Sequence, residues 1–475
     1  MSVVELSTRR PPTRSQRSLC GWGRVAAGSC SVLEPRDVQD VLDALDAGRT
    51  SGTGLIARGA GRSYGDAAQN ADGVVLDMTA LDRIVAVDVQ RRLITAQAGA
   101  TIAQLMARLA ADGLGLPVVP GTRHVTLAGA IASDIHGKNH HRDGGFARHV
   151  ANITLCTPSA GTVLLSPETD AELFYATLGG MGLTGVIVEA TLHAEPLASP
   201  WVSADVDRTA GLSETLELLS GDEHHRYSVA WLDLLADGAR AGRAVISRAD
   251  PLPLGAQGPS ASRRRRASAP YPAALSRRPA VVVPDRVPAR ALSRSAVRAF
   301  NALRWHAAPT RERGRPLEMA PYFFPLDVLG EWNRLYGSGG LIQHQIVIPA
   351  GRETVLERCF ELIRARRLPV YLAVFKRFGA AFGGPLSFPL EGWTLAIDVP
   401  ACAPGVAATL NQLDELVAGC GGRVYLSKDV RLRRELLEAM YPRLESFDAE
   451  RDRVDPDGVL RSDLGRRLGL CAGAS

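Results

Sequence analysis

Short apolar runs separated by glycine-rich turns dominate the first 200 residues of the chain. Four of these runs predict strands, at residues 55–57, 74–76, 84–87 and 93–95. Residues 101–109 have helical spacing instead, with Thr101 placed to cap the helix and Gly113 to end it. This part of the sequence predicts an α+β domain with irregular connections.

Beyond residue 340 the pattern changes to longer elements in a regular order. A strand at 342–348 is followed by a helix at 353–366, strands at 370–375 and 394–399, and a helix near 407–418. This order predicts an antiparallel sheet that is half exposed and backed by helices.

Composition is that of a folded, enzyme-sized protein. The chain is 46% hydrophobic and 22% charged. Its length of 475 residues predicts two or three domains. No run reaches the roughly 18 apolar residues of a membrane-spanning helix, and the arginines near the N-terminus precede no apolar stretch typical of a signal peptide. We therefore expect a protein of the cytoplasm or of the membrane periphery. The seven scattered cysteines, without a CxxC pair, argue against a disulfide framework or a zinc site.

Positive charge is concentrated in one segment. Residues 251–315 contain 14 arginines and nine prolines against two acidic residues, Asp285 and Glu312, so the net charge of +5 conceals a basic insert in an acidic body. Its content of Pro, Ser and Ala predicts a mobile loop at least to about residue 290. Two interpretations stay open: a solvated linker, or attraction to anionic lipid, near which each arginine gains about 1 kcal/mol.

Three of the 55 basic residues are lysines: Lys138, Lys376 and Lys428. Such a skew towards arginine indicates codon bias, which exchanges the two residues on a solvated surface but not where a compact ammonium or a titratable amine is needed. Each lysine is therefore a candidate functional residue, against the alternative that it was retained by chance.

Two glycine-containing loops could bind phosphate. Residues 58–66 (RGAGRSYGD) follow a predicted strand, and their glycines let backbone amides approach an anion. They are not a Rossmann fingerprint, because no GxGxxG opens a long helix, and an ordinary tight turn is an alternative. Residues 120–141 add the small residues and donors that a pyrophosphate needs. The three histidines at residues 136–141 lack a carboxylate pair or cysteine at ligand spacing, which disfavours a metal.

Both loops, together with residues 182–187 (GLTGVI), resemble the FAD-binding half of the vanillyl-alcohol-oxidase or p-cresol-methylhydroxylase (PCMH) superfamily. Within it, the chain is similar to the decaprenylphosphoryl-β-D-ribose 2′-oxidase family, on residues 135–141, 330–333, 375–376, 385–389 and 425–429. The resemblance runs from residues 21–24 to residues 453–456 and is poorest across the basic insert.

A two-domain α+β flavoprotein is the fold that this resemblance implies. It comprises a flexible N-terminus (1–18), a PCMH-type FAD-binding domain (19–195), a substrate-binding domain with an antiparallel sheet and helices (196–415, including the basic insert at about 251–315), and a C-terminal segment (416–475) that returns to the FAD-binding domain.

The resemblance also implies FAD that is held non-covalently. Arg62 stands where many members of the superfamily carry the histidine that is bonded to the flavin. The implied cofactor-binding residues are Ala57, Arg58, Gly59, Ala60, Gly61, Arg62, Ser63, Tyr64, Gly65, Asp66, Gly121, Thr122, Thr126, Leu127, Ala128, Gly129, Ser133, Asp134, Ile135, His136, Gly137, Asn139, Ile187 and Tyr425.

Oxidation of an alcohol by a flavin needs a group that takes the hydroxyl proton, and a buried lysine suits this role. The resemblance places Lys428 across the flavin, which makes it the first candidate for a catalytic residue, and gives Lys376 a contact with a substrate phosphate or hydroxyl. Gln343 and Gln345 would alternate towards and away from the site, with Gln345 facing it and contributing to catalysis.

The remaining candidates carry alternatives. As catalytic residues, His136 would lie at the flavin edge and Tyr64 near the isoalloxazine or the pocket mouth; alternatively, each makes only a structural hydrogen bond. Lys138 would anchor a phosphate, or pair with Asp134 or Asp143.

The implied substrate pocket comprises Gln343, Phe323, Thr394 and Ala396. The best-known members of the family carry Tyr, Asn and Cys at the last three positions. Because the pocket has lost polar groups while the lysines and glutamines remain, we expect the redox chemistry to survive and the sugar or lipid carrier to be open to change.

Oxidation of the 2′-hydroxyl of a polyprenylphosphoryl-β-D-ribose is the activity that the resemblance implies. It would be the first half of an epimerisation, completed by an NADH-dependent short-chain reductase, that supplies arabinan for the cell wall. One alternative is an FAD-dependent oxidase of a free sugar, alditol or nucleotide-linked sugar. The other is a membrane- or polyanion-binding protein on a relic flavin fold. No nucleic-acid partner is expected.

Overall fold

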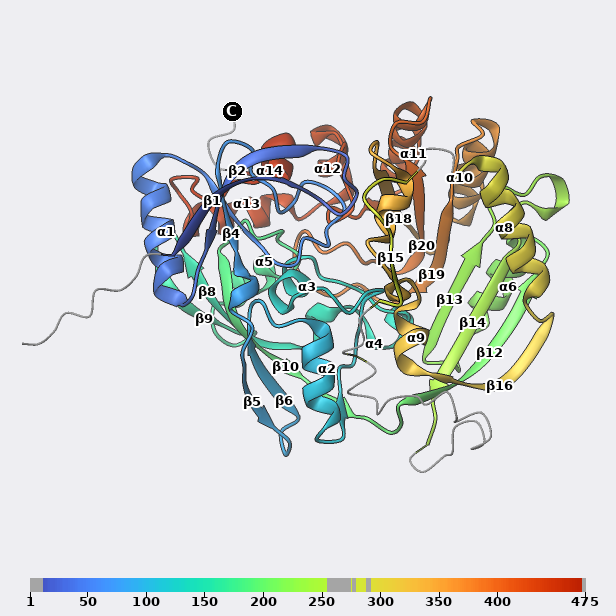
Figure 1. Cartoon of the computed structure of the whole chain (residues 1–475), viewed down its shortest axis with the longest axis horizontal. Helices are drawn as coiled ribbons and strands as arrows, with labels where there is room; N and C mark the ends of the chain where they lie inside the picture. The colour runs from blue at the N-terminus through green and yellow to red at the C-terminus, as the bar shows by residue number, and fades with distance from the viewer. Residues whose placement is uncertain (1–11, 254–274, 276–278, 288–291, 472–475) are drawn as a thin grey trace, which may run out of the picture.

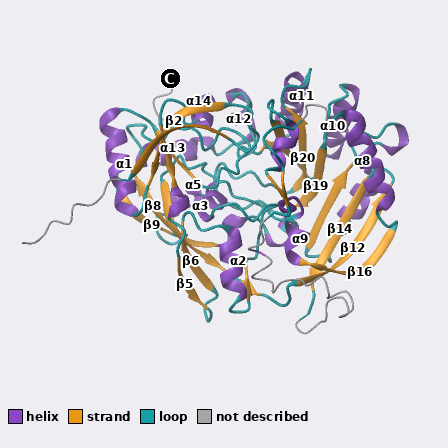
Figure 2. Cartoon of the chain, viewed as in Figure 1, coloured by secondary structure: helices purple, strands orange, loops and turns teal. Residues whose placement is uncertain are grey.

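The computed structural model describes residues 12–253, 275, 279–287 and 292–471, and they form two halves with loops gathered between them (Figures 1 and 2). The N-terminal half contains a four-stranded sheet and a five-stranded antiparallel sheet. The first has the order β1 (Thr13–Cys20), β2 (Ala27–Glu34), β4 (Val74–Asp77), β3 (Leu55–Arg58), and the second β5 (Ile84–Asp88), β6 (Leu93–Gln97), β10 (Val186–His193), β8 (Val150–Thr157), β9 (Gly161–Leu165).

Predicted elements of this half are confirmed, including the helix after residue 101. Helix α2 (Ile102–Ala110) begins with a capping box in which the Thr101 side chain accepts from the backbone of Gln104. The helix ends before Gly113, whose φ of 71° suits glycine. The other helices of this half are α1 (Val38–Ser51), α3 (Leu127–Ala132), α4 (His140–Asp143) and α5 (Ala171–Thr177).

An eight-stranded antiparallel sheet forms the second half, as the sequence predicts. Its order is β16 (Arg311–Glu318), β12 (Trp201–Thr209), β14 (Ala244–Pro251), β13 (Tyr227–Leu232), β19 (Leu372–Phe378), β20 (Gly392–Pro400), β18 (Leu341–Pro349), β21 (Arg423–Val424). Phe375 stacks on Trp393 and contacts Phe360 of α10 (Glu353–Ala365), so this face of the sheet is covered by helices. Side chains alternate along a strand, so Lys376 and its neighbours on the other face point to the first half.

The remaining helices, turns and short strands complete the two halves. They are α6 (Leu212–Ser220), α8 (Arg294–Ala307), α9 (Met319–Phe323), α11 (Val406–Gly419), α12 (Arg434–Met440), α13 (Leu444–Val454) and α14 (Asp463–Arg467), the 3₁₀ turns η5 (Pro325–Val328) and η6 (Trp332–Tyr336), and the pairs β7 (Leu114–Gly115) with β11 (Glu195–Pro196) and β15 (Val281–Val282) with β17 (Leu329–Gly330). Within the described residues, no helix is long and apolar enough to cross a membrane.

Three expectations about segments need correction. Residues 13–18 are not flexible, because they pair with β2 as part of β1. The predicted loop up to about residue 290 contains β15, which pairs with β17, and the rest of the basic insert forms α8 and β16; residues 254–274, 276–278 and 288–291 lie outside the described residues. A boundary at 415 falls inside α11. The chain then lies against the first half, where Leu460 bridges to Leu55.

Candidate active site

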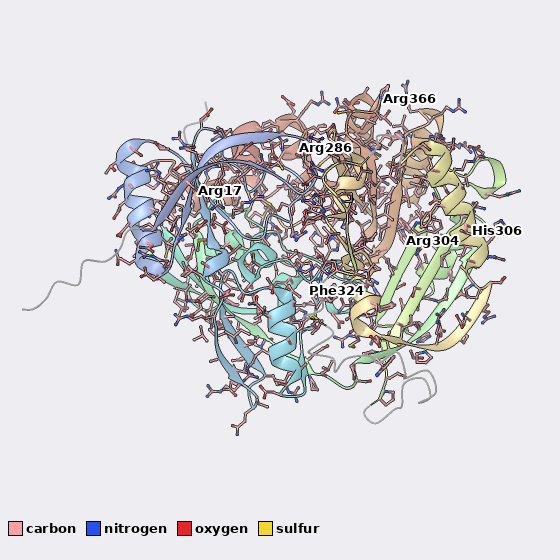
Figure 3. All side chains as sticks on the ribbon, viewed as in Figure 1. Arg17, Arg286, Arg304, His306, Phe324 and Arg366 are labelled. Carbon is pink, nitrogen blue, oxygen red and sulfur yellow. The ribbon has the colours of Figure 1, made fainter. Side chains whose placement is uncertain are left out.

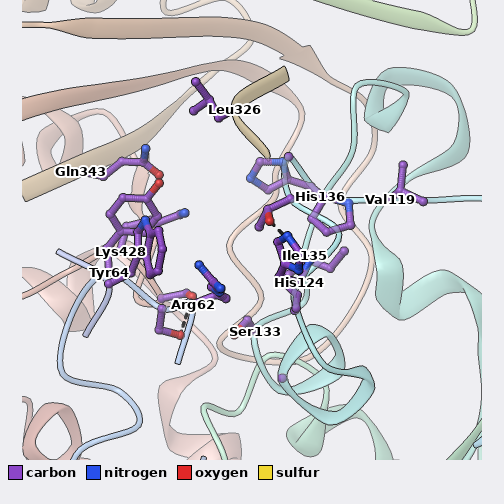
Figure 4. A pocket seen from close by; sticks show the side chains of 18 of the residues that line it. Arg62, Tyr64, Val119, His124, Ser133, Ile135, His136, Leu326, Gln343 and Lys428 are labelled. Atoms are coloured by element: carbon purple, nitrogen blue, oxygen red, sulfur yellow. Dashed lines mark hydrogen bonds between the residues drawn. The ribbon is translucent and has the colours of Figure 1, made fainter. Parts of the chain in front are cut away.

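A cavity of about 800 Å³ lies between the two halves, within the usual range for cofactor and substrate sites. Its lining includes the two glycine loops, β18, β19 and residues 425–428. Figure 4 shows Tyr64, Lys428 and Gln343 on one wall and His136 and Ile135 on the facing wall.

The glycine-loop end is shaped for a close backbone approach. A Cβ on Gly59 would lie 2.0 Å from Oγ1 of Thr126, so the two loops touch where only glycine fits. Gly61, with a φ of 64°, turns the chain back, and Arg58 fixes the turn by donating to the carbonyls of Ala68 and Cys20. A narrow trough lined by small residues and backbone groups suits the extended pyrophosphate of FAD.

Most of the predicted cofactor residues line this cavity. They are Ala57, Arg58, Gly59, Ala60, Gly61, Arg62, Ser63, Tyr64, Gly121, Thr122, Thr126, Ala128, Gly129, Ser133, Ile135, His136, Gly137, Ile187 and Tyr425. The Arg62 guanidinium lies 4.0 Å from the centre of the Trp22 ring, which holds it at the cavity wall.

Five predicted cofactor residues lie behind the lining instead. Gly65 packs against the Asp429 carbonyl, Asp66 accepts from Arg467, Leu127 is in the core, Asp134 accepts from the Ala147 amide, and Asn139 donates to the Pro117 carbonyl. These contacts hold the loops in shape, so the prediction of direct contact is not supported for this group.

His136 joins Lys376 to Gln345 through its two ring nitrogens. Nδ1 is 2.9 Å from Nζ of Lys376, and Nε2 is 2.9 Å from Nε2 of Gln345. Burial, and then the Lys376 charge, hold the pKa of His136 well below its usual value, so the ring is neutral. Burial, together with Lys138 and Lys428, lowers the pKa of Lys376 to about 7.

Thr394 fixes the orientation of the Gln345 amide, which contacts His136. It does not line the cavity, which corrects its assignment to the pocket wall. Its hydroxyl donates to the Ile346 carbonyl at 2.9 Å and accepts from Nε2 of Gln345 at 3.1 Å. The Gln345 amide nitrogen is therefore free to donate its second hydrogen to His136.

Both predicted glutamines face the cavity, although we expected them to alternate towards and away. Residues two apart on a strand share a face, and His344 between them points to the opposite side, 3.3 Å from Asp414 of α11. Gln343 donates to Oδ1 of Asp398 at 2.6 Å.

Lys428 reaches into the cavity beside Tyr64. Its Nζ lies 3.8 Å from the centre of the Tyr64 ring. Burial lowers the pKa of Lys428 to about 7, partly offset by the charge of Asp398. Burial raises the pKa of the Tyr64 phenol well above its usual value, so that group keeps its proton.

The third lysine also lines the cavity but makes neither of the predicted ion pairs. Lys138 donates to the Tyr322 carbonyl, and its Nζ lies 4.1 Å from the centre of the Tyr322 ring. Asp143 is instead held by Arg226 at 2.7 Å. Phe323 and Ala396 line the cavity as predicted.

Asp398 lies behind the cavity lining, where it holds Gln343, and the sequence interpretation did not identify it. It lies on β20 directly opposite Gln343, and burial raises its pKa to about 7. Its Oδ2 is buried without a hydrogen-bond partner among the described residues. The available signal was an acidic residue in an otherwise apolar strand, two positions after Ala396.

Comparison of the sequence with known proteins identifies the family of this chain. A family model described as an FAD binding domain matches residues 31–166. Over 471 residues, 98% of this chain and the whole of the relative, the sequence is 40% identical to decaprenylphosphoryl-beta-D-ribose oxidase of Mycolicibacterium smegmatis. The chain belongs to the decaprenylphosphoryl-β-D-ribose oxidase family. It is thus an FAD-dependent oxidoreductase with a PCMH-type fold, which removes the alternative of a relic flavin fold.

Two further relatives are similar to most of the chain. An uncharacterized protein of Streptomyces coelicolor is 40% identical over 359 residues, which cover 75% of this chain and 96% of the relative. The L-gulono-1,4-lactone dehydrogenase of Mycobacterium tuberculosis is 27% identical over 456 residues, 94% of this chain and 97% of the relative.

Proposed function

We propose that this protein oxidises the 2′-hydroxyl of a polyprenylphosphoryl-β-D-ribose to a 2′-keto group. The observation that carries the proposal is the convergence of all three lysines, His136 and Gln345 on one cavity with the FAD-binding loops. The 40% identity to an oxidase named for this lipid-linked ribose supports the substrate class. The keto product would need a separate reductant to become the arabinosyl epimer, so an NADH-dependent short-chain reductase is the expected partner in arabinan synthesis.

Lys428 would act as the base that accepts the proton of the substrate hydroxyl. When bound, FAD supplies the acceptor for the hydride that leaves the carbinol carbon. A neutral Lys428 amine removes the hydroxyl proton as the carbonyl forms, and its pKa of about 7 makes the neutral form available at neutral pH. Tyr64, whose phenol stays protonated, packs against the amine and limits where it can point.

The hydrogen-bonded series that runs from Lys376 through His136 and Gln345 to Thr394 would orient the sugar. With Gln345 donating to Nε2 of His136, the ring proton lies on Nδ1 and is donated to a neutral Lys376 amine. Protonation of Lys376 reverses this bond, moves the ring proton to Nε2 and requires the Gln345 amide to turn its oxygen to His136. The group that Gln345 turns to His136 therefore depends on the charge of Lys376: the amide nitrogen when Lys376 is neutral and the amide oxygen when it is protonated.

The position of the keto group tests the proposal. Product formed in air and reduced with sodium borodeuteride should carry deuterium at C2′, as a mixture of ribo and arabino epimers located by NMR. Deuterium at another carbon, or none, would reject 2′-oxidation.

FAD should be bound without a covalent link, because Arg62 cannot form the flavin bond and lies against Trp22. Acid or heat precipitation should therefore release all the yellow chromophore into the supernatant. Flavin that stays with the precipitated protein would refute this prediction.

Replacing Asp398 by asparagine should shift the pH dependence of flavin reduction to lower pH. The carboxylate favours the ammonium form of Lys428, so its removal lowers the pKa of the lysine further, and the neutral amine persists in more acidic solution. The measurement is the pH profile of the anaerobic reduction rate. A midpoint that does not shift would show that the charge of Asp398 does not influence the pKa of Lys428.

A second candidate function is oxidation of a free sugar, alditol or nucleotide-linked sugar. The 27% identity to a lactone dehydrogenase over 94% of this chain favours it. The same FAD chemistry would serve both, so only the substrate distinguishes them.

A further inference from the structure

Arg467 differs from the arginines that codon bias explains. Arginines such as Arg17, Arg286 and Arg366 are exposed at the surface, where lysine would serve as well (Figure 3). Arg467 lies at the end of α14, and 24% of its side chain is exposed. Its guanidinium donates to segments that lie far apart in the sequence. A set of partners of this kind needs the planar fork of arginine.

One partner of Arg467 is Asp66, the last residue of the glycine loop at residues 58–66. Nε and Nη2 of Arg467 lie 3.1 and 2.9 Å from the two carboxylate oxygens of Asp66, which makes the pair bidentate. Helix α14 also contacts this part of the chain through its backbone, because the Asp463 amide donates to the Gln69 carbonyl at 2.8 Å. Figure 1 shows the helix, in red, beside the blue strand β2. The helix thus holds the glycine loop from behind the cavity lining.

The other partner of Arg467 is Asp429, the residue after Lys428. Nη1 of Arg467 donates to Oδ2 of Asp429 at 2.8 Å and to the Leu432 carbonyl at 3.0 Å. Oδ1 of Asp429 accepts from the Leu432 amide at 2.9 Å, so both carboxylate oxygens are bonded. The Asp429 side chain is 2% exposed, and a carboxylate buried to this degree needs a cation beside it. Arg467 supplies that cation.

The glycine loop and the turn at residues 425–429, which we call the lysine turn, are in direct contact. A Cβ on Gly65 would lie 1.7 Å from the Asp429 carbonyl oxygen, so only glycine lets the two segments meet here. Beside this point the Tyr64 amide donates to the Ser427 carbonyl at 3.0 Å. A small separation of the two segments would therefore break contacts on both.

The guanidinium of Arg467 keeps two carboxylates together at this contact. Burial raises the pKa of Asp66, the bond from Arg467 opposes this rise, and the charge of Asp429 adds to it. Without the guanidinium, two largely buried carboxylates would repel each other and drive the segments apart. Because Tyr64 and Lys428 are within two residues of these carboxylates, the separation would move the amine away from the ring that it now covers at 3.8 Å.

We propose that Arg467 is a positioning residue for the oxidation: by bridging Asp66 and Asp429, it holds the amine of Lys428 in place against the FAD-binding glycine loop. The proposal rests on the proposed role of Lys428 and adds the residue that sets where its amine lies. Arg467 is not among the described residues that line the cavity, so it acts through Lys428 and not on the substrate.

Amine labelling of the FAD-loaded protein tests the position of Lys428 without a substrate. The chain has three lysines, so acetic anhydride followed by mass spectrometry of the peptides resolves each of them. Burial lowers the pKa of Lys428 and of Lys138 to about 7, so in wild type the labelling of both should rise through that pH. In Arg467→Ala the lysine turn becomes less buried. The Lys428 midpoint should then rise by at least about one pH unit towards the ordinary lysine value, while the Lys138 midpoint stays.

Arg466→Ala is the matched control, because Arg466 is the neighbouring residue of the same helix and donates to Oδ1 of Asn70 instead. It should leave both midpoints unchanged. The proposal is overturned by an unchanged Lys428 midpoint in Arg467→Ala, by an equal shift of Lys138, or by an equal shift in Arg466→Ala. If Arg467→Ala does not accumulate as folded protein, Arg467→Lys decides. A single ammonium cannot replace the fork, so the Lys428 midpoint should again rise, and an unchanged midpoint overturns the proposal.

Flavin reduction then tests the consequence for the reaction. Arg467→Ala should lower the maximal rate of reduction by lipid-linked ribose roughly 10- to 100-fold, because a misplacement of about 1 Å has an effect of this size. The half-saturating substrate concentration should change little, since Arg467 does not reach the substrate. A maximal rate equal to that of wild type overturns the positioning role. If no lipid-linked ribose reduces the flavin of wild type, the proposed function fails, whereas the labelling result still decides whether Arg467 sets the position of Lys428.

Discussion

Lys428→Ala should retain FAD and slow flavin reduction by lipid-linked ribose roughly 10²–10⁴-fold, the usual contribution of a general acid or base. The lysine projects into the cavity beside Tyr64, and its pKa of about 7 leaves a neutral amine at physiological pH. In wild type the reduction rate should accordingly rise with pH through about 7 and then level off, because only the neutral amine accepts a proton. Anaerobic stopped-flow measurement of flavin absorbance checks both.

Lys428→Arg is the informative control for this prediction. Arginine keeps a cation over the Tyr64 ring but cannot lose its proton near neutral pH. If proton removal is the role of Lys428, the arginine variant should be as slow as the alanine variant and should lose the rise near pH 7. Near-normal reduction in Lys428→Ala would remove the residue from the mechanism.

Gly59→Ala should yield protein that is largely free of FAD and less stable than wild type. The new Cβ would lie 2.0 Å from Oγ1 and 3.1 Å from Cβ of Thr126, so the two loops must separate. Overpacking of this kind costs about 1–3 kcal/mol. Flavin content per protein and the melting temperature measure the two effects.

Two further variants separate this effect from a general cost of replacing glycine. Gly419→Ala adds a Cβ that meets nothing within 4 Å, and it should keep full FAD content. Gly59→Ala/Thr126→Ala removes the closest contact, Oγ1, and should recover part of the bound FAD. Full flavin content in Gly59→Ala alone would contradict the close approach of the loops.

The sequence predicted the parts of the site that depend on composition or local geometry. Codon bias singled out the lysines before any resemblance was considered, and all three line the cavity. The Thr101 cap follows from local backbone chemistry and was found in place. Gly59 was identified for the same local reason, as a backbone position that lets another group approach closely.

What the sequence could not provide depends on which strands are neighbours. Asp398 holds Gln343 of the cavity wall because β20 pairs with β18 in a register that sets the two residues opposite each other. Thr394 was placed in the pocket, but its hydroxyl bonds to a β18 carbonyl beneath Gln345. The Pro, Ser and Ala content of the basic insert predicted a loop to about residue 290, whereas β15 within it pairs with β17, a contact that local sequence does not report.

Anaerobic titration of the FAD-loaded protein tests the central claim, that the cavity oxidises a lipid-linked ribose, most directly. Polyprenylphosphoryl ribose should bleach the flavin, with one equivalent of keto sugar formed per flavin reduced, while free ribose, alditols and nucleotide-linked sugars leave the visible spectrum unchanged. Bleaching by a free or nucleotide-linked sugar, with no response to the lipid-linked ribose, would contradict it.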